Sequence, residues 1–182
     1  IPMPTSVLVT PEDIKFRVNQ SEGALAITTL EHVTKVAEVQ HECPSLKHLI
    51  VVGGRCDGWS EYEGLVNSAS PKLDQRSIGK TRSTDPLLIF FTSGTESYPK
   101  MVLHSHGYPL AHIVTAKFVD DLHSTDLHLA VADTGWAKTA FGKLFGQWIC
   151  GAAVLQRNPL GGFNPKITLS VIERFGVTTF CA

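Results

Sequence analysis

Short apolar runs alternate with amphipathic runs along the whole chain, and this alternation is the feature that most restricts the fold. The apolar runs have the length of buried strands, at 23–29, 48–54, 86–92 and 177–182. The segments between them repeat apolar residues at helical spacing, as in LEHVTKVAEVQ at 30–40. Strands separated by helices form parallel sheets, because a parallel pair needs a crossover connection. We therefore predict an α/β fold that is layered, with mostly parallel sheets flanked by helices.

The ends of two predicted helices carry strong signals. Pro11 opens a helix at 11–21 and is followed by two acids, and Gly176 stops a helix that begins at Asn164. Weaker patterns predict the remaining elements, which are helices at 30–40, 59–69, 107–122 and 134–151 and strands at 126–133 and 152–156.

A polar stretch at about 70–85, SPKLDQRSIGKTRSTD, contains proline, glycine and scattered charges. This composition is typical of a surface linker, so we predict a linker between two α/β segments. The chain starts without methionine and ends in VTTFCA, a β-branched and aromatic run typical of a buried strand. We interpret it as an internal fragment of a longer protein.

The composition excludes some classes of protein. Of the 182 residues, 43% are hydrophobic and 18% charged, a balance typical of a folded globular domain. The net charge of −1 leaves no basic stripe, so we expect no nucleic-acid partner. The best candidate for a membrane span, 144–155, is too short and contains Gln147, so we expect no such span.

The stretch FTSGTESYPK, at 91–100, follows the predicted strand at 86–92. Ligands of α/β proteins gather beyond the carboxyl ends of strands. Gly94 allows the backbone to approach a ligand closely, and Lys100 adds a charge suited to phosphate. The stretch also offers four hydroxyls, those of Thr92, Ser93, Thr95 and Ser97. We predict a phosphate-binding loop, with an ordinary polar turn as the alternative.

The loop differs from a Walker-type phosphate loop, whose pattern is G-x-x-x-x-G-K-[ST]. Gly94 and Lys100 fit this pattern, but Pro99 stands at the second glycine and Met101 at the Ser/Thr that holds Mg²⁺. We therefore do not expect a Walker-type NTPase.

FTSGTESYPK instead resembles the phosphate-loop signature of the adenylate-forming superfamily, [YF]-T-S-G-[ST]-T-G-x-P-K. Seven of its nine specified positions match, and Glu96 and Ser97 are the two departures. ADTGWAK, at 132–138, is similar to the acyl-CoA synthetase branch, in particular the medium-chain type. The resemblance implies that 1–182 is part of the AMP-binding (adenylation) domain, within the superfamily's large N-terminal domain.

The resemblance also implies a set of site residues. Those expected to hold ATP phosphates and the departing pyrophosphate are Thr92, Ser93, Gly94, Thr95, Glu96, Ser97, Tyr98, Pro99 and Lys100. Lys100 would be a positioning charge, and the catalytic residues would lie outside this chain. The acyl-pocket candidates are Trp136, Lys138, Phe141 and Gly142. Core packing is an equal alternative for Trp136 and Phe141, and is the prediction for Phe145 and Trp148.

Other polar residues near these segments have simpler explanations. His104, His106 and His112 have no spacing that defines a closed zinc site, so we expect no metal ligands among them. His104 and His106 follow the loop, at a predicted helix entry or surface, with a contact to the nucleotide as the alternative. Asp133 is predicted to cap a helix that starts at Thr134.

The implied activity belongs to the longer protein. It would activate a short- or medium-chain carboxylic acid with ATP and Mg²⁺ to an acyl-adenylate, then transfer the acyl group to coenzyme A. This chain alone would be inactive, and the expected location is the cytoplasm, or the mitochondrial matrix in a eukaryote. The alternatives are an aryl-acid or other adenylate-forming ligase and a non-enzymatic relative with an altered loop.

Glu96 is the main support for the non-enzymatic alternative. A carboxylate about 4 Å from a phosphate charge costs about 1 kcal/mol in water and about 4 kcal/mol at a dielectric of 20. We therefore expect Glu96 to turn away from the phosphates or to be bridged by a cation.

Overall fold

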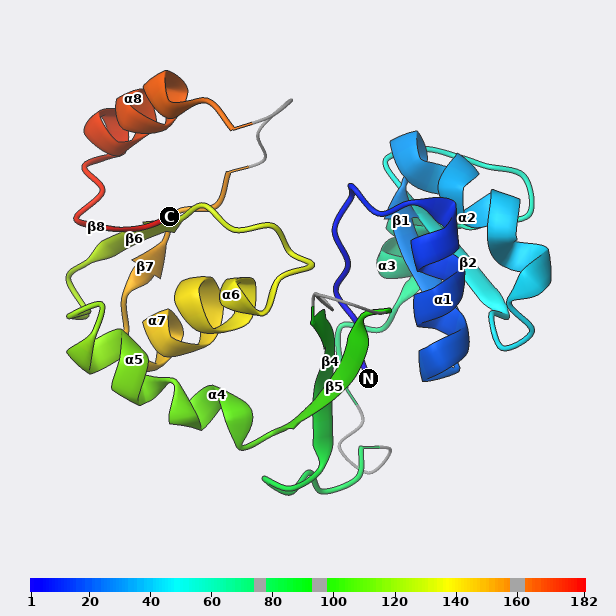
Figure 1. The fold of residues 1–182 in the computed structure, drawn as a ribbon, viewed down its shortest axis with the longest axis horizontal. Coiled ribbons are helices and arrows are strands. Elements are labelled where there is room, and N and C mark those ends of the chain that lie inside the picture. Colours follow the sequence, from blue (N-terminus) through cyan, green and yellow to red (C-terminus); the bar gives the residue numbers. More distant parts are fainter. Residues whose placement is uncertain (74–77, 93–97, 158–162) are drawn as a thin grey trace. The chain divides into compact units, whose positions relative to one another are not determined.

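The computed structural model describes residues 1–73, 78–92, 98–157 and 163–182. They form two compact units (Figure 1), one made of Val7–Lys80 and the other of Ile1–Ser6 together with Thr81–Ala182. The first six residues thus belong to the same unit as the C-terminal half of the chain. That residues 70–85 act as a linker remains a proposal.

The unit Val7–Lys80 is built on a parallel sheet of order β1-β2-β3. Its helices, in chain order, begin with α1, which the sequence predicted at the same bounds. The elements are α1 Pro11–Ser21, β1 Leu25–Thr29, η1 Leu30–His32, α2 Val33–Val39, η2 Gln40–Glu42, β2 His48–Val52, β3 Ser60–Glu61 and α3 Tyr62–Ser68.

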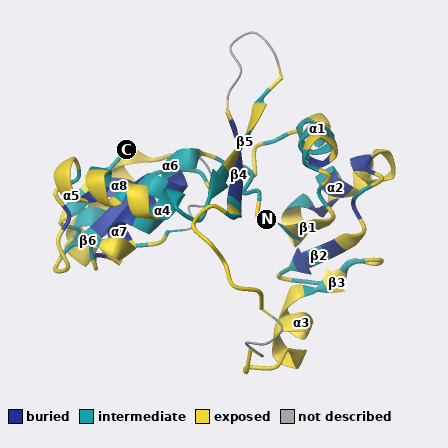
Figure 2. Ribbon diagram, turned by 90° about the horizontal axis from the view of Figure 1, so that it is seen from below, coloured by how far each residue is buried: buried dark blue, intermediate teal, exposed yellow. Residues whose placement is uncertain are grey.

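Helix α1 is fixed at its start by a capping box. The Thr10 hydroxyl accepts a hydrogen bond from the Asp13 amide, and the Asp13 carboxylate accepts one from the Thr10 amide. These bonds from Thr10 hold the pKa of Asp13 below its usual value. The core beneath α1 consists of Val18, Val36, Cys43, Leu46 and Leu49. Strand β2 carries buried residues, whereas α3 is exposed along its length (Figure 2).

The second unit starts with an antiparallel hairpin of β4 (Pro86–Thr92) and β5 (Lys100–Ser105). A parallel sheet of order β7-β6-β8 follows, made of β6 Leu127–Ala130, β7 Ala153–Val154 and β8 Thr179–Cys181. The helical elements are α4 Tyr108–Ala111, α5 Ile113–Phe118, α6 Ala137–Thr139, the π-helical turn η3 Ala140–Leu144, α7 Phe145–Ile149 and α8 Pro165–Phe175.

Helices cover both faces of the sheet β7-β6-β8. Helices α6 and α7 lie on one face and α8 on the other (Figure 1). Helix α8 has the predicted ends, since Asn164 caps its first turn and Gly176 closes it in the left-handed conformation. With parallel pairing in two sheets, the predicted α/β class is confirmed.

The hairpin strand β5 is an element that the sequence analysis missed. Lys100 and His104 were predicted in a loop and a helix entry, but they lie in a strand that pairs with β4 from Pro86↔Ser105 to Thr92↔Lys100. The run KMVLHS is short and ends in polar residues, so its pattern did not stand out from that of a loop.

Three predicted helices are shorter or broken. The helix at 107–122 is divided at His112 into α4 and α5 and ends at Phe118. The helix at 134–151 starts only at Ala137 and contains the π-helical turn η3. The first segment of the helix predicted at 59–69 is instead strand β3.

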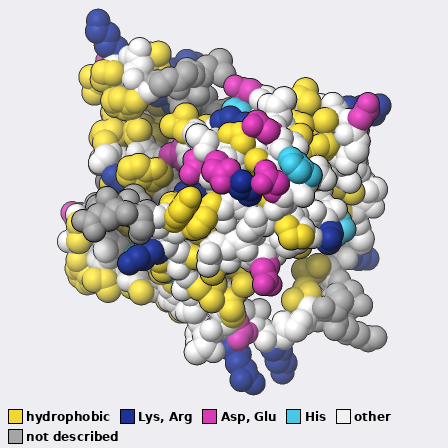
Figure 3. Space-filling model, turned by 45° about the vertical axis from the view of Figure 1, so that its right-hand side comes forward, with side chains coloured by type: hydrophobic (Ala, Val, Ile, Leu, Met, Phe, Trp, Pro, Cys, Tyr) yellow, Lys and Arg dark blue, Asp and Glu magenta, His cyan; other side chains and the backbone are white. Residues whose placement is uncertain are grey.

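Acidic and basic side chains are interspersed on the face drawn in Figure 3, as the net charge of −1 leads one to expect. Within the described ranges, no helix combines the length and the apolar character needed to cross a membrane.

Aromatic rings link β5 to the helices of the second unit. The His104 ring lies 4.1 Å from that of Tyr108, and the Tyr108 ring lies 4.5 Å from that of His112. His112 in turn stacks on Phe141 at 5.3 Å. Burial lowers the pKa of both histidines, and His104 lowers the pKa of His112 further through charge repulsion.

This histidine pair predicts a pH-dependent stability. On unfolding, both imidazoles regain a pKa near 6.5, so below that pH the unfolded state binds more protons than the folded state. The stabilising effect of the neutral rings is complete above pH 6.5 and is lost as the pH falls toward the lower folded pKa values.

Thermal unfolding measured at pH 7.5, 6.5 and 5.5 should show a midpoint temperature that falls with the pH. His104→Phe should flatten this dependence, whereas His41→Asn, at a histidine with a 76% exposed side chain, should not.

Candidate functional site

The predicted phosphate-binding residues lie at the end of the β4-β5 hairpin where the loop connects the two strands. Thr92 is paired with Lys100, and its hydroxyl lies 3.5 Å from the Lys100 carbonyl oxygen. Both residues are exposed, as is Tyr98, and Pro99 is half-buried. The other predicted loop residues lie outside the described ranges, and they are Ser93, Gly94, Thr95, Glu96 and Ser97. The expected orientation of Glu96 therefore stays a prediction.

The base of the hairpin is held rigidly. Leu88 and Phe90 of β4 are buried against Ala140 of the π-helical turn. The Ile89 amide donates a hydrogen bond of 3.0 Å to the carbonyl of Pro2, which ties the hairpin to the first residues of the chain. Thr92 thus ends a buried strand, and Lys100 begins the more exposed strand paired with it.

The charge at this hairpin end suits an anion. In the part of the chain that the structure describes, Lys100 forms no ion pair with a carboxylate. Such an exposed ammonium group is available to a phosphate group.

A tight turn follows β6, and Asp133 organises it. One oxygen of the Asp133 carboxylate accepts a hydrogen bond of 2.8 Å from the Gly135 amide, and the other accepts one of 2.8 Å from the Ser6 hydroxyl. The Asp133 carbonyl accepts bonds from the Trp136 amide at 3.0 Å and the Thr139 hydroxyl at 2.6 Å. The prediction that Asp133 caps a helix starting at Thr134 is wrong, because the carboxylate closes this turn and the helix begins at Ala137.

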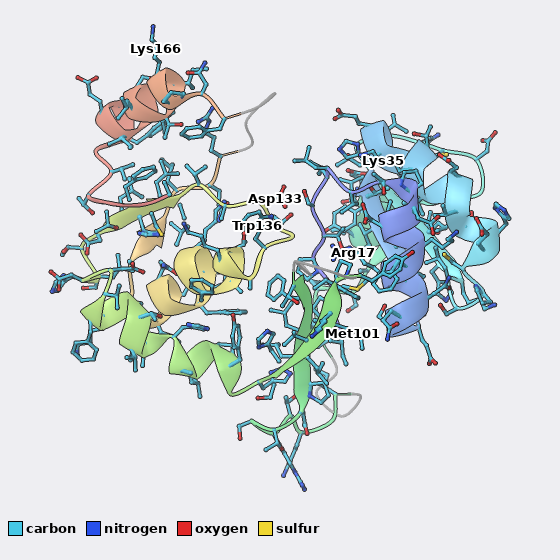
Figure 4. The ribbon with its side chains drawn as sticks, viewed as in Figure 1. Arg17, Lys35, Met101, Asp133, Trp136 and Lys166 are labelled. Atoms are coloured by element: carbon cyan, nitrogen blue, oxygen red, sulfur yellow. The ribbon has the colours of Figure 1, made fainter. Side chains whose placement is uncertain are left out.

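The turn leaves no room for a side chain at Gly135. A Cβ atom there would overlap the backbone nitrogen of Ser6 and lie 3.0 Å from the Ser6 Cα. The Thr134 hydroxyl also lies 3.4 Å from the carbonyl of Thr5. Figure 4 shows Asp133 and Trp136 on this turn, beside the N-terminal segment.

The four acyl-pocket candidates do not all come together. Trp136 is 67% exposed, on the turn itself. Lys138 is half-buried and its Cγ lies 3.3 Å from where a Cβ of Gly142 would be. Phe141 stacks on His112, on the side of α4. Their role in binding an acyl group stays a prediction.

Gly142 is held by a buried histidine. The His128 ring, 1% exposed, places Nε2 2.9 Å from the Gly142 carbonyl oxygen and Nδ1 2.9 Å from the Thr179 hydroxyl. This imidazole therefore joins the π-helical turn to strands β6 and β8.

Of the two aromatic residues predicted to be core, one is and one is not. Phe145 packs against the buried cluster of Leu88, Phe90 and Ala140, as expected. Trp148 is 61% exposed, so the prediction for it was wrong. The indole lies on a face of α7 that the described residues leave uncovered, which an apolar sequence pattern does not reveal.

The connections that follow β6 and β7 indicate a ligand-binding position beyond the carboxyl ends of these two strands. From β6 the chain leaves to the face covered by α6 and α7, and from β7 it leaves to the opposite face, covered by α8 (Figure 1). In α/β proteins, ligands bind beyond the carboxyl ends of neighbouring strands whose connections diverge in this way. Asp133 and Trp136 follow β6 directly and stand at this position.

Metal coordination finds no support in the described residues. Among them, no three His, Cys, Asp or Glu side chains are grouped so that they could hold an ion. His104 and His112 each pack against the ring of Tyr108.

The residue that the sequence analysis missed here is Ser6. It lies 127 positions before the carboxylate that it contacts, and it belongs to no motif. No local signal in the sequence could have found it.

Gln147 is fully buried, and within the described ranges neither atom of its amide has a hydrogen-bond partner. An unsatisfied buried polar group is costly, so Gln147→Met should stabilise the protein by about 1–3 kcal/mol. The measurement is the thermal or urea unfolding midpoint. Gln40→Met, at an exposed glutamine, is the matched control and should change little. A loss of stability in Gln147→Met would instead show that a buried water satisfies the amide.

Comparison with known proteins agrees with this geometry. The chain matches the family described as AMP-binding enzyme over residues 1–182. It is 34% identical to mouse acyl-coenzyme A synthetase ACSM4, mitochondrial, over 99% of this chain and 31% of that protein. It is also 34% identical to human acyl-coenzyme A synthetase ACSM3, mitochondrial, over 99% of this chain and 30% of that protein. The chain thus spans about a third of the length of these relatives.

Solved structures show the same fold. The acyl-CoA synthetase of Brucella canis superposes with a TM-score of 0.83 at 25% identity, over 97% of this chain and 31% of that one. The anthranilate CoA ligase AuaEII, in complex with anthranoyl-AMP, gives a TM-score of 0.85 at 24% identity, over 95% and 33%. Because the family match extends over every residue of the chain, this protein belongs to the AMP-binding enzyme family.

Proposed function

We propose that this chain is part of an AMP-forming acyl-CoA synthetase. In the first step, a carboxylate oxygen of the acid attacks the α-phosphorus of ATP, which yields an acyl-adenylate and releases pyrophosphate. In the second, the sulfur of coenzyme A attacks the acyl carbonyl carbon and AMP leaves. The observation that carries the proposal is the identity of 34% to curated acyl-coenzyme A synthetases over 99% of this chain.

The hairpin end is the proposed site for the β- and γ-phosphates and the departing pyrophosphate. The exposed Lys100 ammonium group and Thr92 hydroxyl support this role, because both project from a rigid strand pair. Lys100 would orient the phosphates as a fixed charge, so that less of the binding free energy is spent on ordering them. Tyr98, Pro99 and the loop residues 93–97 complete the proposed site.

The turn after β6 is the proposed site for the acid. Its position beyond the carboxyl ends of diverging strands supports this assignment, and the exposed Trp136 indole offers an apolar surface to an acyl chain. Lys138, Phe141 and Gly142 follow on the adjoining helical turns and are the remaining proposed lining residues.

The proposed co-substrates are ATP and coenzyme A, with Mg²⁺ bound to the phosphates of ATP. In this proposal the ion would bind together with the nucleotide. When bound, Mg²⁺ supplies charge neutralisation on the phosphate oxygens.

The proposed acids are fatty acids of short or medium chain length. The mammalian relatives are mitochondrial by name, which favours the mitochondrial matrix over the cytoplasm if the source is a eukaryote.

The test uses the full-length protein and a panel of butyrate, hexanoate, octanoate and benzoate. We expect acid-dependent exchange of pyrophosphate into ATP, and AMP release that requires coenzyme A, with fatty acids preferred to benzoate. A preference for benzoate would identify an aryl-acid ligase. Absence of exchange with every acid, together with no ATP binding in calorimetry, would identify a non-enzymatic relative. The 182-residue chain alone should show no turnover.

A further inference from the structure

The N-terminal segment contacts the turn after β6 at three places. The Ser6 hydroxyl donates a 2.8 Å hydrogen bond to the Asp133 carboxylate. The Thr134 hydroxyl lies 3.4 Å from the Thr5 carbonyl oxygen, and the backbone of Gly135 is in close contact with that of Ser6. These contacts join residues that are separated by about 130 positions in the sequence, as the Ser6–Asp133 separation of 127 illustrates.

Of these contacts, the hydrogen bond from the Ser6 hydroxyl to Asp133 has the most direct effect on the conformation of the turn. The same carboxylate accepts the Gly135 amide with its other oxygen, so its rotamer decides whether the turn is closed. The Ser6 hydroxyl holds the second oxygen through a part-buried hydrogen bond. The Trp136 amide bonds to the Asp133 carbonyl, so the backbone that carries the indole depends on the same residue.

The other end of the N-terminal segment is also anchored. The Pro2 carbonyl accepts the Ile89 amide at 3.0 Å, in the strand that leads to the proposed phosphate site. Residues 2–6 therefore span from β4 to the turn that carries Trp136. A segment attached at both ends places the Ser6 hydroxyl with little freedom.

We propose that Ser6 is a positioning residue for the acid substrate: its bond to Asp133 holds the turn that presents Trp136 to the acyl group. The proposal rests on the proposed function for its substrate. It assigns to Ser6 an effect on acid affinity and none on ATP affinity, because the Ser6 hydroxyl bonds to the turn after β6, whereas Thr92 and Lys100 of the proposed phosphate site lie on the β4-β5 hairpin.

The activity test compares Ser6→Ala with Ser6→Thr in the full-length protein. Ser6→Ala should raise KM for the acid by about three- to tenfold, the effect of losing one typical hydrogen bond, and leave KM for ATP unchanged. Ser6→Thr keeps the hydroxyl and should restore the normal KM. An equal rise in both KM values, or no rise in either, would overturn the proposal.

Thr178→Val is the matched control. Thr178 donates a hydrogen bond of the same 2.8 Å length to Asp126, across 52 positions, but lies by the sheet and away from the turn. It should leave both KM values unchanged. If Thr178→Val raises KM for the acid as much as Ser6→Ala does, the effect is a general loss of structure and the positioning role is wrong.

Amide hydrogen exchange gives a readout that does not depend on activity. The peptide covering 133–139 should exchange faster in Ser6→Ala than in the unchanged protein, because the Gly135 and Trp136 amides lose their fixed acceptors. It should not change in Thr178→Val. Faster exchange in a protein that activates no acid would overturn the proposed function but keep the role of Ser6 in the turn. Unchanged exchange would overturn that role.

Discussion

Replacing Gly135 by alanine in the full-length protein should lower kcat/KM for the acid by about ten- to a hundredfold, which corresponds to about 1–3 kcal/mol. The new methyl group would overlap the Ser6 backbone nitrogen and lie 3.0 Å from the Ser6 Cα. Backbone atoms cannot rotate away as a flexible side chain can. Either the turn or the N-terminal segment must therefore move, and both the Ser6–Asp133 bond and the position of Trp136 change with it.

The measurement is the steady-state rate of acid-dependent AMP release with coenzyme A in excess. Gly64→Ala is the matched control, because a Cβ at Gly64 would have its nearest neighbour at 3.9 Å, an ordinary contact. We expect less than a twofold change in that variant. A Gly135→Ala enzyme with normal kcat/KM would show that the turn takes no part in binding the acid.

Replacing Lys100 by alanine should weaken ATP binding by about ten- to a hundredfold, because a charge-assisted hydrogen bond contributes about 1.5–3 kcal/mol. Lys100 is the exposed first residue of β5. Truncating its side chain therefore creates no cavity and should leave the unfolding midpoint unchanged. The measurement is calorimetric titration of the full-length protein with ATP in the presence of Mg²⁺.

A second exposed lysine of the same unit serves as control for net charge. Lys117, on α5, lies near the Phe118 ring and not at the hairpin end. Lys117→Ala should bind ATP as the unchanged protein does. If both variants weaken ATP binding equally, the effect is one of overall charge and Lys100 has no specific contact with phosphate.

The elements that could be predicted from the sequence are those with local signals. Helices α1 and α8 have the expected bounds. A capping residue followed by proline marks each start, and a residue in the left-handed conformation, Glu22 or Gly176, ends each helix. Strand β4 also has its predicted bounds, since PLLIFFT is a continuous apolar run between polar segments. In each case the interactions that set the ends lie within a few residues of one another.

The predictions were wrong where contacts with residues outside the segment decide its structure. Strand β5 forms because β4 is beside it, and its own pattern resembled that of a loop. The helix predicted at 134–151 starts late because Asp133 is engaged by Ser6 and Gly135. Trp148 has an apolar side chain, but whether such a residue is covered depends on what packs over its helix.

The sequence by itself determined the α/β class, the resemblance to adenylate-forming enzymes and the stretch at 91–100 that carries it, because these depend on short-range patterns. Only the tertiary structure decided that Ser6 meets Asp133 and that Gly135 must lack a side chain. The contact across 127 positions arises because residues 2–6 run from β4, where the Pro2 carbonyl accepts the Ile89 amide, to the turn after β6. Neither the residue types nor their spacing predicts a contact between such distant residues. The residues that hold the turn can therefore be identified only in the folded structure.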